Sequence, residues 1–495
     1  MNKNFGFTHK SGILMPISSL PSKYGIGSLG KEAYKFIDFL SLTGQKCWQV
    51  LPLNPTSYGD SPYQSPATNA GNPYFIDLDI LYSDGLLTKE ELKEAANSSD
   101  RVNYGRLFET RYELLRKAHR RFDKTKEFGS FVKKNAFWLD DYALFMALKV
   151  QYGFAPWFLW RDEHKCVDKA RAEGEKYEAE CDFWRFLQFE FFTQWKRLKS
   201  YANGKGILII GDMPIYVAHD SVDVWSAPEQ FLLDNGLMPT SVAGCPPDSF
   251  CEDGQLWGNP LYRWEYMRED GFSWWRSRVG AALELYDILR IDHFRGFASF
   301  YSIPYGDVNA KRGEWIVGPG VELFRAITSA FPKAKIIAED LGFITDDVRA
   351  LLAATDIPGM KVLQFAFSSD ESEYLPRNFT TKNCVVYTGS HDSDCTKSRI
   401  REMSAEVKAR FNKECPHIKG QSRTYDAISL IMNSISELAI VPMQDYLELE
   451  NEQGRMNIPS VAEGNWQWRL KKNYRTDALI KKIRSVCRGR LYKKR

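Results

Sequence analysis

The chain has 495 residues, which is enough for one large barrel domain with insertions or for two to four ordinary domains. Hydrophobic residues make up 44% and charged residues 26%, so we expect a soluble protein with a sizeable buried core. The formal net charge is only +3, and the one long basic run stands at the extreme C-terminus, so the charge pattern does not indicate a nucleic-acid groove.

The location of the protein is indicated by what the chain lacks. Its N-terminal segment has no apolar stretch typical of a secretory signal, and no apolar run is long enough to cross a bilayer. The nine cysteines are scattered without a C-x-x-C pair, which favours free thiols over a disulfide framework or a zinc site. We therefore expect a cytoplasmic protein that is a monomer or a homodimer, with no membrane or nucleic-acid partner.

Short apolar runs rich in β-branched residues recur along the chain, and each is followed by polar residues. Continuous apolar runs of this length are typical of strands buried on both faces, as in parallel sheets. In chain order they are Ile13–Ile17, Cys47–Leu51, Ile207–Gly211, Tyr286–Ile291, Lys335–Ala338, Met360–Phe365, Cys384–Tyr387 and Ala439–Pro442.

Helical patterns lie between many of these runs. They cover Lys31–Leu42, Phe183–Tyr201, Phe272–Leu285, Val321–Phe331 and Tyr425–Glu437. Eight strands that alternate with helices predict an α/β fold, a (β/α)8 TIM barrel.

Two stretches interrupt the predicted barrel. Residues 81–182 are charged and predict an inserted helical subdomain, whereas residues 213–270 are rich in Pro, Gly, Trp and Asn and predict a long ordered loop region over one barrel end. The expected organisation is residues 1–80 as the start of the barrel, 81–182 as the helical insertion, 183–212 as barrel, 213–270 as the loop-rich insertion and 271–495 as the remainder. No separate C-terminal β-domain is expected.

Acidic residues follow four of the predicted strands, at the end where such barrels carry their active sites. They are Asp212, Asp292, Glu339 with Asp340, and Asp392. Buried carboxylates are costly unless they are paired or used. Any one of them alone has an ordinary structural interpretation, as a helix cap or an ion-pair partner. Four strand ends together favour an active site.

The spacing of these residues predicts their roles. Side chains alternate across a strand, so Arg290 and Asp292 share a face, and the guanidinium favours the ionised form of Asp292. Of Glu339 and Asp340, only one is expected to point into the barrel mouth. A glutamate among apolar neighbours has a raised pKa and can act as an acid. An ionised nucleophile and a carboxylic acid are the pair that a retaining glycosidase needs.

Several segments resemble known enzymes. Three short ones resemble the catalytic segments of the α-amylase clan: RIDHFRG at Arg290–Gly296, AEDLG at Ala338–Gly342 and GSHD at Gly389–Asp392. Three longer ones are more specific and resemble the amylomaltase, or 4-α-glucanotransferase, family: Val50–Leu78, Gly211–Trp225 and Gly254–Trp264. The resemblance extends from about Gly12 to Trp468.

The resemblance implies a retaining enzyme that transfers α-1,4-glucan segments between maltooligosaccharides or glucans, without a cofactor or a metal ion. It implies that Asp292 is the nucleophile, Glu339 the general acid/base and Asp392 a third carboxylate that holds sugar hydroxyls. It also implies substrate-binding residues: Arg290, which orients Asp292; His391 and Asp212 in the −1 subsite; Ser57, Tyr58 and Asp60 on the donor side; Gln255 and Trp257 on the acceptor side; and Asn465 near the site.

Some assignments stay open at this stage. Tyr104 is either a glucan contact away from the catalytic centre or a packing residue. Ser249 stands where the family usually has an aromatic residue, which predicts altered acceptor preference or more hydrolysis. Three other functions remain: an α-glucan hydrolase of the same clan, a non-catalytic glucan-binding protein and a nucleotide-dependent enzyme, although no G-x-G-x-x-G or P-loop segment supports the last.

Overall fold

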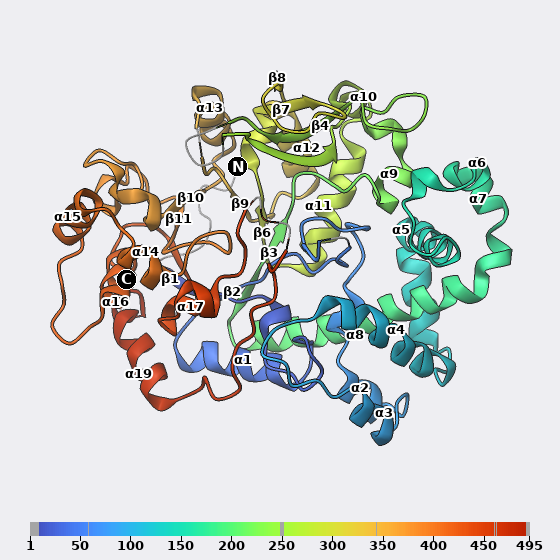
Figure 1. Ribbon diagram of the computed structural model, residues 1–495, viewed down its shortest axis with the longest axis horizontal. Helices are drawn as coiled ribbons and strands as arrows, with labels where there is room; N and C mark the ends of the chain where they lie inside the picture. The colour runs from blue at the N-terminus through green and yellow to red at the C-terminus, as the bar shows by residue number, and fades with distance from the viewer. Residues whose placement is uncertain are drawn as a thin grey trace.

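The computed structural model describes residues 9–57, 59–247, 252–342, 344–459, 461 and 463–491. Eight parallel strands close into a barrel in the order β1-β12-β11-β10-β9-β6-β3-β2 (Figure 1). They are β1 (Lys10–Leu14), β2 (Cys47–Gln49), β3 (Leu208–Met213), β6 (Ile288–Ile291), β9 (Ile336–Ala338), β10 (Gly359–Val362), β11 (Cys384–Tyr387) and β12 (Leu438–Pro442). Each overlaps one predicted run, so the predicted barrel is confirmed.

The first strand begins three residues before the predicted run. Strand β1 includes Ser11 and Gly12, which an apolar pattern does not detect. A Cβ atom at position 12 would lie 2.6 Å from the carbonyl oxygen of Cys47 in β2, so this close approach of two strands requires glycine. The predicted run from Met360 to Phe365 is also only partly strand, because a 3₁₀ helix begins at Leu363.

Helices surround the barrel. They include α1 (Lys31–Leu42), α8 (Glu178–Gly204), α11 (Ser273–Leu285), α12 (Gly320–Ala330), α13 (Asp346–Thr355), α14 (Thr396–Arg401), α16 (Arg423–Met432) and α19 (Asp477–Val486). The five predicted helices coincide with α1, α8, α11, α12 and α16, although α16 ends five residues earlier than predicted. Among the described residues, no helix is long and apolar enough to cross a membrane.

Helices also fill most of the stretch 81–182. They are α3 (Lys89–Glu94), α4 (Tyr104–Arg120), α5 (Lys126–Gln151), α6 (Asp162–Lys165) and α7 (Val167–Ala172), and α4 to α7 lie to the right of the barrel in Figure 1. Helix α5 packs along α8 and joins this group to the barrel.

The stretch 213–270 is more regular than predicted. It contains α9 (Val222–Ser226), β4 (Ser241–Cys245), β5 (Gln255–Pro260) and α10 (Trp264–Glu269). Strands β4 and β5 join β7 (Ser299–Pro304) and β8 (Glu314–Val317) in an antiparallel sheet of order β5-β4-β7-β8. Strand β5 contains Gly, Asn and Pro, which have low strand propensity, and it is held by pairing with β4, while loops connect these short elements.

A C-terminal arginine joins the start of β1 to the end of α16 and to the segment before β12. The guanidinium of Arg490 is buried and donates to the carbonyl oxygens of Met432, Ser436 and Ile431 at 2.9–3.0 Å, and to that of Lys10 at 3.2 Å. Without it, these carbonyl groups would be buried without these hydrogen bonds, which is costly.

We predict that Arg490→Met lowers the free energy of unfolding by about 2–4 kcal/mol, because a side chain of similar length leaves several buried carbonyls unsatisfied. Urea denaturation measures the change. The control is Arg488→Met, on the exposed side of the same short helix, which should change the free energy by less than about 0.5 kcal/mol. Equal effects of the two substitutions would contradict this role for Arg490.

Candidate active site

Four of the predicted carboxylates lie at one end of the barrel. Asp212 is the second-to-last residue of β3, Asp292 directly follows β6, Glu339 directly follows β9, and Asp392 lies in the loop after β11. All eight strands are parallel, so their carboxyl ends meet at the same rim.

One buried guanidinium holds two of these carboxylates. The pairing of β3 with β6 sets Asp212 opposite Arg290. The Nη1 atom of Arg290 lies 2.6 Å from Oδ1 of Asp212, and its Nη2 atom lies 2.9 Å from Oδ1 of Asp292. Arg290 is 2% exposed. The predicted pairing with Asp292 is therefore confirmed, and Asp212 shares the same cation.

The backbone holds Glu339. Its Oε2 accepts a hydrogen bond from the amide of His293 at 2.7 Å, and its Oε1 accepts one from the amide of Leu341 at 2.8 Å. Asp340 points the other way, since its Oδ1 accepts from the amide of Met360 at 2.6 Å in the barrel wall. As predicted, only one of the two adjacent acidic residues faces the site.

Asp392 is held from two sides. Its Oδ2 lies 3.1 Å from Nε2 of His391, and its Oδ1 accepts a hydrogen bond from Nδ2 of Asn457 at 2.6 Å. The ring of His391 stacks on Tyr63, with centroids 5.2 Å apart and planes 14° apart. The hydroxyl of Tyr63 donates to Oδ2 of Asp212 at 2.8 Å. The side chain of Asp392 remains 41% exposed, so a ligand in the barrel mouth can reach it.

The carboxyl groups differ in their protonation. Partial burial raises the pKa of Glu339, and the nearby charge of Asp292 raises it further. Partial burial also raises the pKa of Asp292, and the Arg290 guanidinium opposes this rise. The guanidinium 2.9 Å from Asp292 favours the ionised form of that residue, whereas the charge of Asp292 favours a proton on Glu339.

The pKa shifts of the other groups complete the pattern. Partial burial acts to raise the pKa of Asp392, but His391 and the hydrogen bond from Asn457 outweigh it and lower that pKa to about 2. Burial lowers the pKa of His293 to about 3, so its imidazole is neutral. The arrangement thus offers one fixed anion at Asp392, one ionisable group beside a guanidinium and one group suited to hold a proton.

The predicted donor-side and acceptor-side residues lie in two separate segments. The Ser57 Oγ donates to the carbonyl oxygen of Gln64 within its own loop at 2.8 Å, and partial burial raises the pKa of Asp60. Gln255 and Trp257 stand on strand β5, where the Trp257 Nε1 donates to Gln255 Oε1 at 3.1 Å. The Trp257 ring meets His293 edge-on, with centroids 4.8 Å apart. Tyr58 and Ser249 lie outside the described residues.

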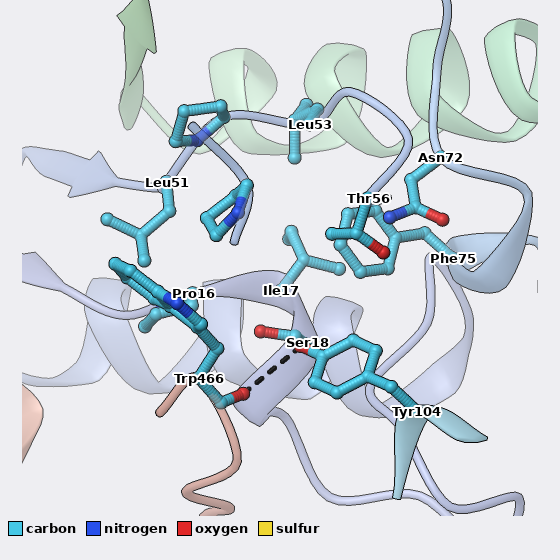
Figure 2. A pocket seen from close by; sticks show the side chains of 12 residues that line it. Pro16, Ile17, Ser18, Leu51, Leu53, Thr56, Asn72, Phe75, Tyr104 and Trp466 are labelled. Carbon is cyan, nitrogen blue, oxygen red and sulfur yellow. Dashed lines mark hydrogen bonds between the residues drawn. The ribbon is translucent and has the colours of Figure 1, made fainter. Parts of the chain in front are cut away.

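Two further residues have structural partners. The Tyr104 hydroxyl donates to the carbonyl oxygen of Trp466 at 3.1 Å, and both residues line a small pocket together with Ile17 and Leu51 (Figure 2). Tyr104 is buried, which favours packing over a glucan contact. The Asn465 amide is used within its own loop, where Oδ1 accepts from Ile458 N at 2.9 Å and Nδ2 donates to the carbonyl oxygen of Val461 at 2.7 Å.

Sequence reasoning did not single out Tyr63 or Asn457. Tyr63 lies within the segment Val50–Leu78 that carried the family resemblance, but it does not follow a strand directly. Asn457 follows the short helix α18 (Asn451–Gly454), well beyond the end of β12, so no strand end points to it.

Comparison with known proteins agrees with this geometry. The family model described as 4-alpha-glucanotransferase matches residues 15–475. A 4-alpha-glucanotransferase of Clostridium butyricum is 47% identical over 485 residues, which cover 96% of this chain and 99% of that protein. A 4-alpha-glucanotransferase of Thermus thermophilus is 44% identical over 482 residues, which cover 93% of this chain and 94% of that protein.

A solved structure matches over the whole fold. An amylomaltase from Streptococcus agalactiae in complex with acarbose has a TM-score of 0.93 at 39% identity, with 97% of this chain and 98% of that chain covered. The match of the family model over most of the chain, together with relatives this similar over their full length, shows the family. This chain belongs to the 4-alpha-glucanotransferase family.

Proposed function

We propose that this 4-alpha-glucanotransferase moves α-1,4-glucan segments between maltooligosaccharides by two successive displacements at one anomeric carbon, with retention of configuration. The observation that carries the proposal is the contrast between two carboxyl groups in one site. Asp292 is paired with a buried guanidinium at 2.9 Å, whereas Glu339 is held by backbone amides beside that charge. Such a contrast suits one group to be a nucleophile and the other an acid.

In the first step, Glu339 gives its proton to the glycosidic oxygen and Asp292 attacks the anomeric carbon. The bond from that carbon to the glycosidic oxygen breaks, and the reducing-end product leaves. In the second step, the 4-hydroxyl of another glucan attacks the same carbon and gives its proton to Glu339, and the bond to Asp292 breaks. The mechanism requires the two carboxyl groups to stand about 5 Å apart. No cofactor takes part in either step.

The surrounding residues bind and orient the sugar. We assign Asp392, His391 and Asp212 to the hydroxyls of the −1 sugar, where their hydrogen bonds promote the reaction only if they tighten in the transition state. Arg290 orients Asp292. Ser57, Tyr58 and Asp60 belong to the donor side, and Gln255 and Trp257 to the acceptor side. Asn465 acts by holding the loop that follows Asn457.

Three broader points belong to the same proposal. The barrel carries the chemistry, with the stretch 81–182 as a helical insertion and the stretch 213–270 covering the active site. The protein acts in the cytoplasm. We propose that it is a monomer or a homodimer.

Incubation of the pure protein with maltotriose alone tests the reaction. We expect a ladder that includes chains longer than maltotriose, together with free glucose and little net gain of reducing ends. Asp292→Asn, which keeps the shape but removes the nucleophile, should produce no ladder. Shorter products only, with rising reducing ends, would indicate a hydrolase, and unchanged maltotriose with the native protein would refute both activities.

The protonation pattern predicts a bell-shaped pH profile for glucan transfer. Activity should fall as the pH decreases through the pKa of Asp292, which must be ionised, and as the pH increases through that of Glu339, which must carry a proton. The midpoints of both limbs should lie at pH values above about 4, the ordinary pKa of a carboxyl side chain, because the pKa values of both residues are raised. Glu339→Gln should lower the rate on maltotriose by at least about 10³-fold.

A donor with a good leaving group, α-maltosyl fluoride, needs no proton to depart. With this donor, Glu339→Gln should retain fluoride release and lose the alkaline limb of the profile. Persistence of the same alkaline limb in this variant would show that another group supplies it.

Tyr63→Phe removes the hydroxyl that donates to Asp212 and keeps the ring that stacks on His391. We expect kcat/KM to fall about 10- to 100-fold, as is typical for the loss of a hydrogen bond to a charged group. The matched control is Tyr24→Phe, which removes a hydroxyl bonded at 2.6 Å to Asp79 on α2 (Leu78–Ser83). A loss in the control as large as that in Tyr63→Phe would contradict a specific role for Tyr63.

A further inference from the structure

Two walls of the barrel mouth are joined by a pair of side-chain amides. One wall is the segment 54–72, which follows β2, and the other is strand β5. The Gln64 Nε2 donates to Asn259 Oδ1 at 3.1 Å and to the Trp257 carbonyl oxygen at 3.4 Å. The Asn259 Nδ2 donates back to Gln64 Oε1 at 3.4 Å. We refer to Gln64 and Asn259 as the amide clasp.

The Asn259 side of the clasp is anchored. Asn259 is 5% exposed, and its Nδ2 also donates to the carbonyl oxygen of Val217 at 2.8 Å. Gln64 is partly exposed, and its backbone carbonyl accepts the Ser57 hydroxyl within the loop. The clasp therefore fastens the loop after β2 to a fixed point on the antiparallel sheet.

Each half of the clasp adjoins an aromatic ring of the site. Gln64 follows Tyr63, which donates to Asp212 and stacks on His391. Asn259 is two residues from Trp257, whose ring meets His293, the residue whose backbone amide holds Glu339. The clasp thus sets the spacing between a ring on the −1 side and a ring on the acceptor side. It contacts neither Asp292 nor Glu339 through any hydrogen bond that the structure describes.

From this placement we infer that Gln64 is a specificity-determining positioning residue, which favours a glucan over water as the acceptor of the glycosyl group. The inference rests on the proposed function, because it takes Trp257 as part of the acceptor side. Gln64 acts through Asn259 and the backbone of Trp257, and it keeps the acceptor wall at a fixed distance from Tyr63.

The glycosyl group attached to Asp292 can be transferred either to a glucan or to water. With a glucan, the 4-hydroxyl oxygen bonds to the anomeric carbon, its proton passes to Glu339, and the bond to Asp292 breaks. With water, the water oxygen bonds to the anomeric carbon, a proton passes to Glu339, the bond to Asp292 breaks, and a free reducing end results. A glucan must be bound and oriented, which costs translational and rotational freedom, whereas water needs no wall to hold it. Displacement of the wall therefore slows transfer more than hydrolysis.

Gln64→Ala tests the inference. We expect the ratio of transfer to hydrolysis on maltotriose to fall about tenfold and the KM for a glucose acceptor to rise about tenfold, as is typical for the loss of one or two neutral hydrogen bonds. Single-turnover fluoride release from α-maltosyl fluoride should stay within about twofold, because the first step does not use the acceptor wall. Gln64→Glu, which has the same shape but cannot donate, should behave like Gln64→Ala.

Two further variants separate the clasp from general loosening of the loop. Asn259→Ala should also lower the ratio, and in the double variant the ratio should fall by less than the product of the two single effects, because the two residues share a contact. Asn54→Ala removes an amide that donates to Thr68 O at 2.7 Å and Ala70 O at 2.9 Å in the same loop, without touching β5. It should lower the melting temperature and leave the ratio within about twofold.

The outcomes are distinguishable. An unchanged ratio in Gln64→Ala, or an equal fall in Asn54→Ala, would overturn the inference while the proposed function stands. Failure of the native protein to form chains longer than maltotriose would instead refute the proposed function. If Asn259→Ala does not fold, the comparison of Gln64→Glu with the native protein decides the question.

Discussion

Arg290 is buried at the rim of the barrel with one carboxylate on each side of its guanidinium. Removing a cation from water costs several kcal/mol unless partners compensate it, which is on the order of the net free energy of unfolding of a whole domain. Asp212 at 2.6 Å and Asp292 at 2.9 Å supply that compensation. The arrangement depends on the parallel register of β3 and β6, which sets Asp212 opposite Arg290, and on the period of two that returns Asp292 to the same face.

The same ion pair explains why the neighbouring carboxyl groups of Asp292 and Glu339 differ in their tendency to ionise. Asp292 has a cation beside it, whereas Glu339 has two backbone amides and the field of Asp292. Asp392 has other direct partners, because His391 and Asn457 hold it in the loop after β11. The Arg290 guanidinium contacts Asp292 and not Glu339, which suits the two residues to the roles of nucleophile and acid proposed above.

Much of this could be predicted from the sequence. Strands buried on both faces appear in the sequence as continuous apolar runs, which is why the barrel strands from Cys47 to Pro442 could be located. The strand ends then identified the four carboxylates, and the alternation within LRID predicted that Arg290 meets Asp292. These features are local, since each depends on a few consecutive residues and on one general property of parallel barrels.

What could not be predicted depends on contacts between distant segments. Strand β5 exists because β4 pairs with it, although its own residues favour a loop. Tyr63 and Asn457 reach the site from loops whose paths are set by tertiary packing, so no spacing rule identifies them. The amides of Asn457 and Asn465 look equivalent in the sequence, yet one meets Asp392 and the other closes its own loop. The start of β1 was hidden by Gly12, which is required by the closeness of β2 and not by any apolar pattern.

The different roles proposed for Asp292 and Glu339 can be tested directly by trapping the covalent glycosyl–enzyme intermediate. Glu339→Gln is mixed with α-maltotriosyl fluoride, and the protein is analysed by intact mass and peptide mapping. We expect the release of one fluoride per chain and the accumulation of one maltotriosyl group on the peptide that contains Asp292, because the missing base slows its removal. Fluoride release with the sugar attached to another carboxylate, or with no attached sugar, would contradict the assignment of Asp292 as the nucleophile and Glu339 as the acid/base.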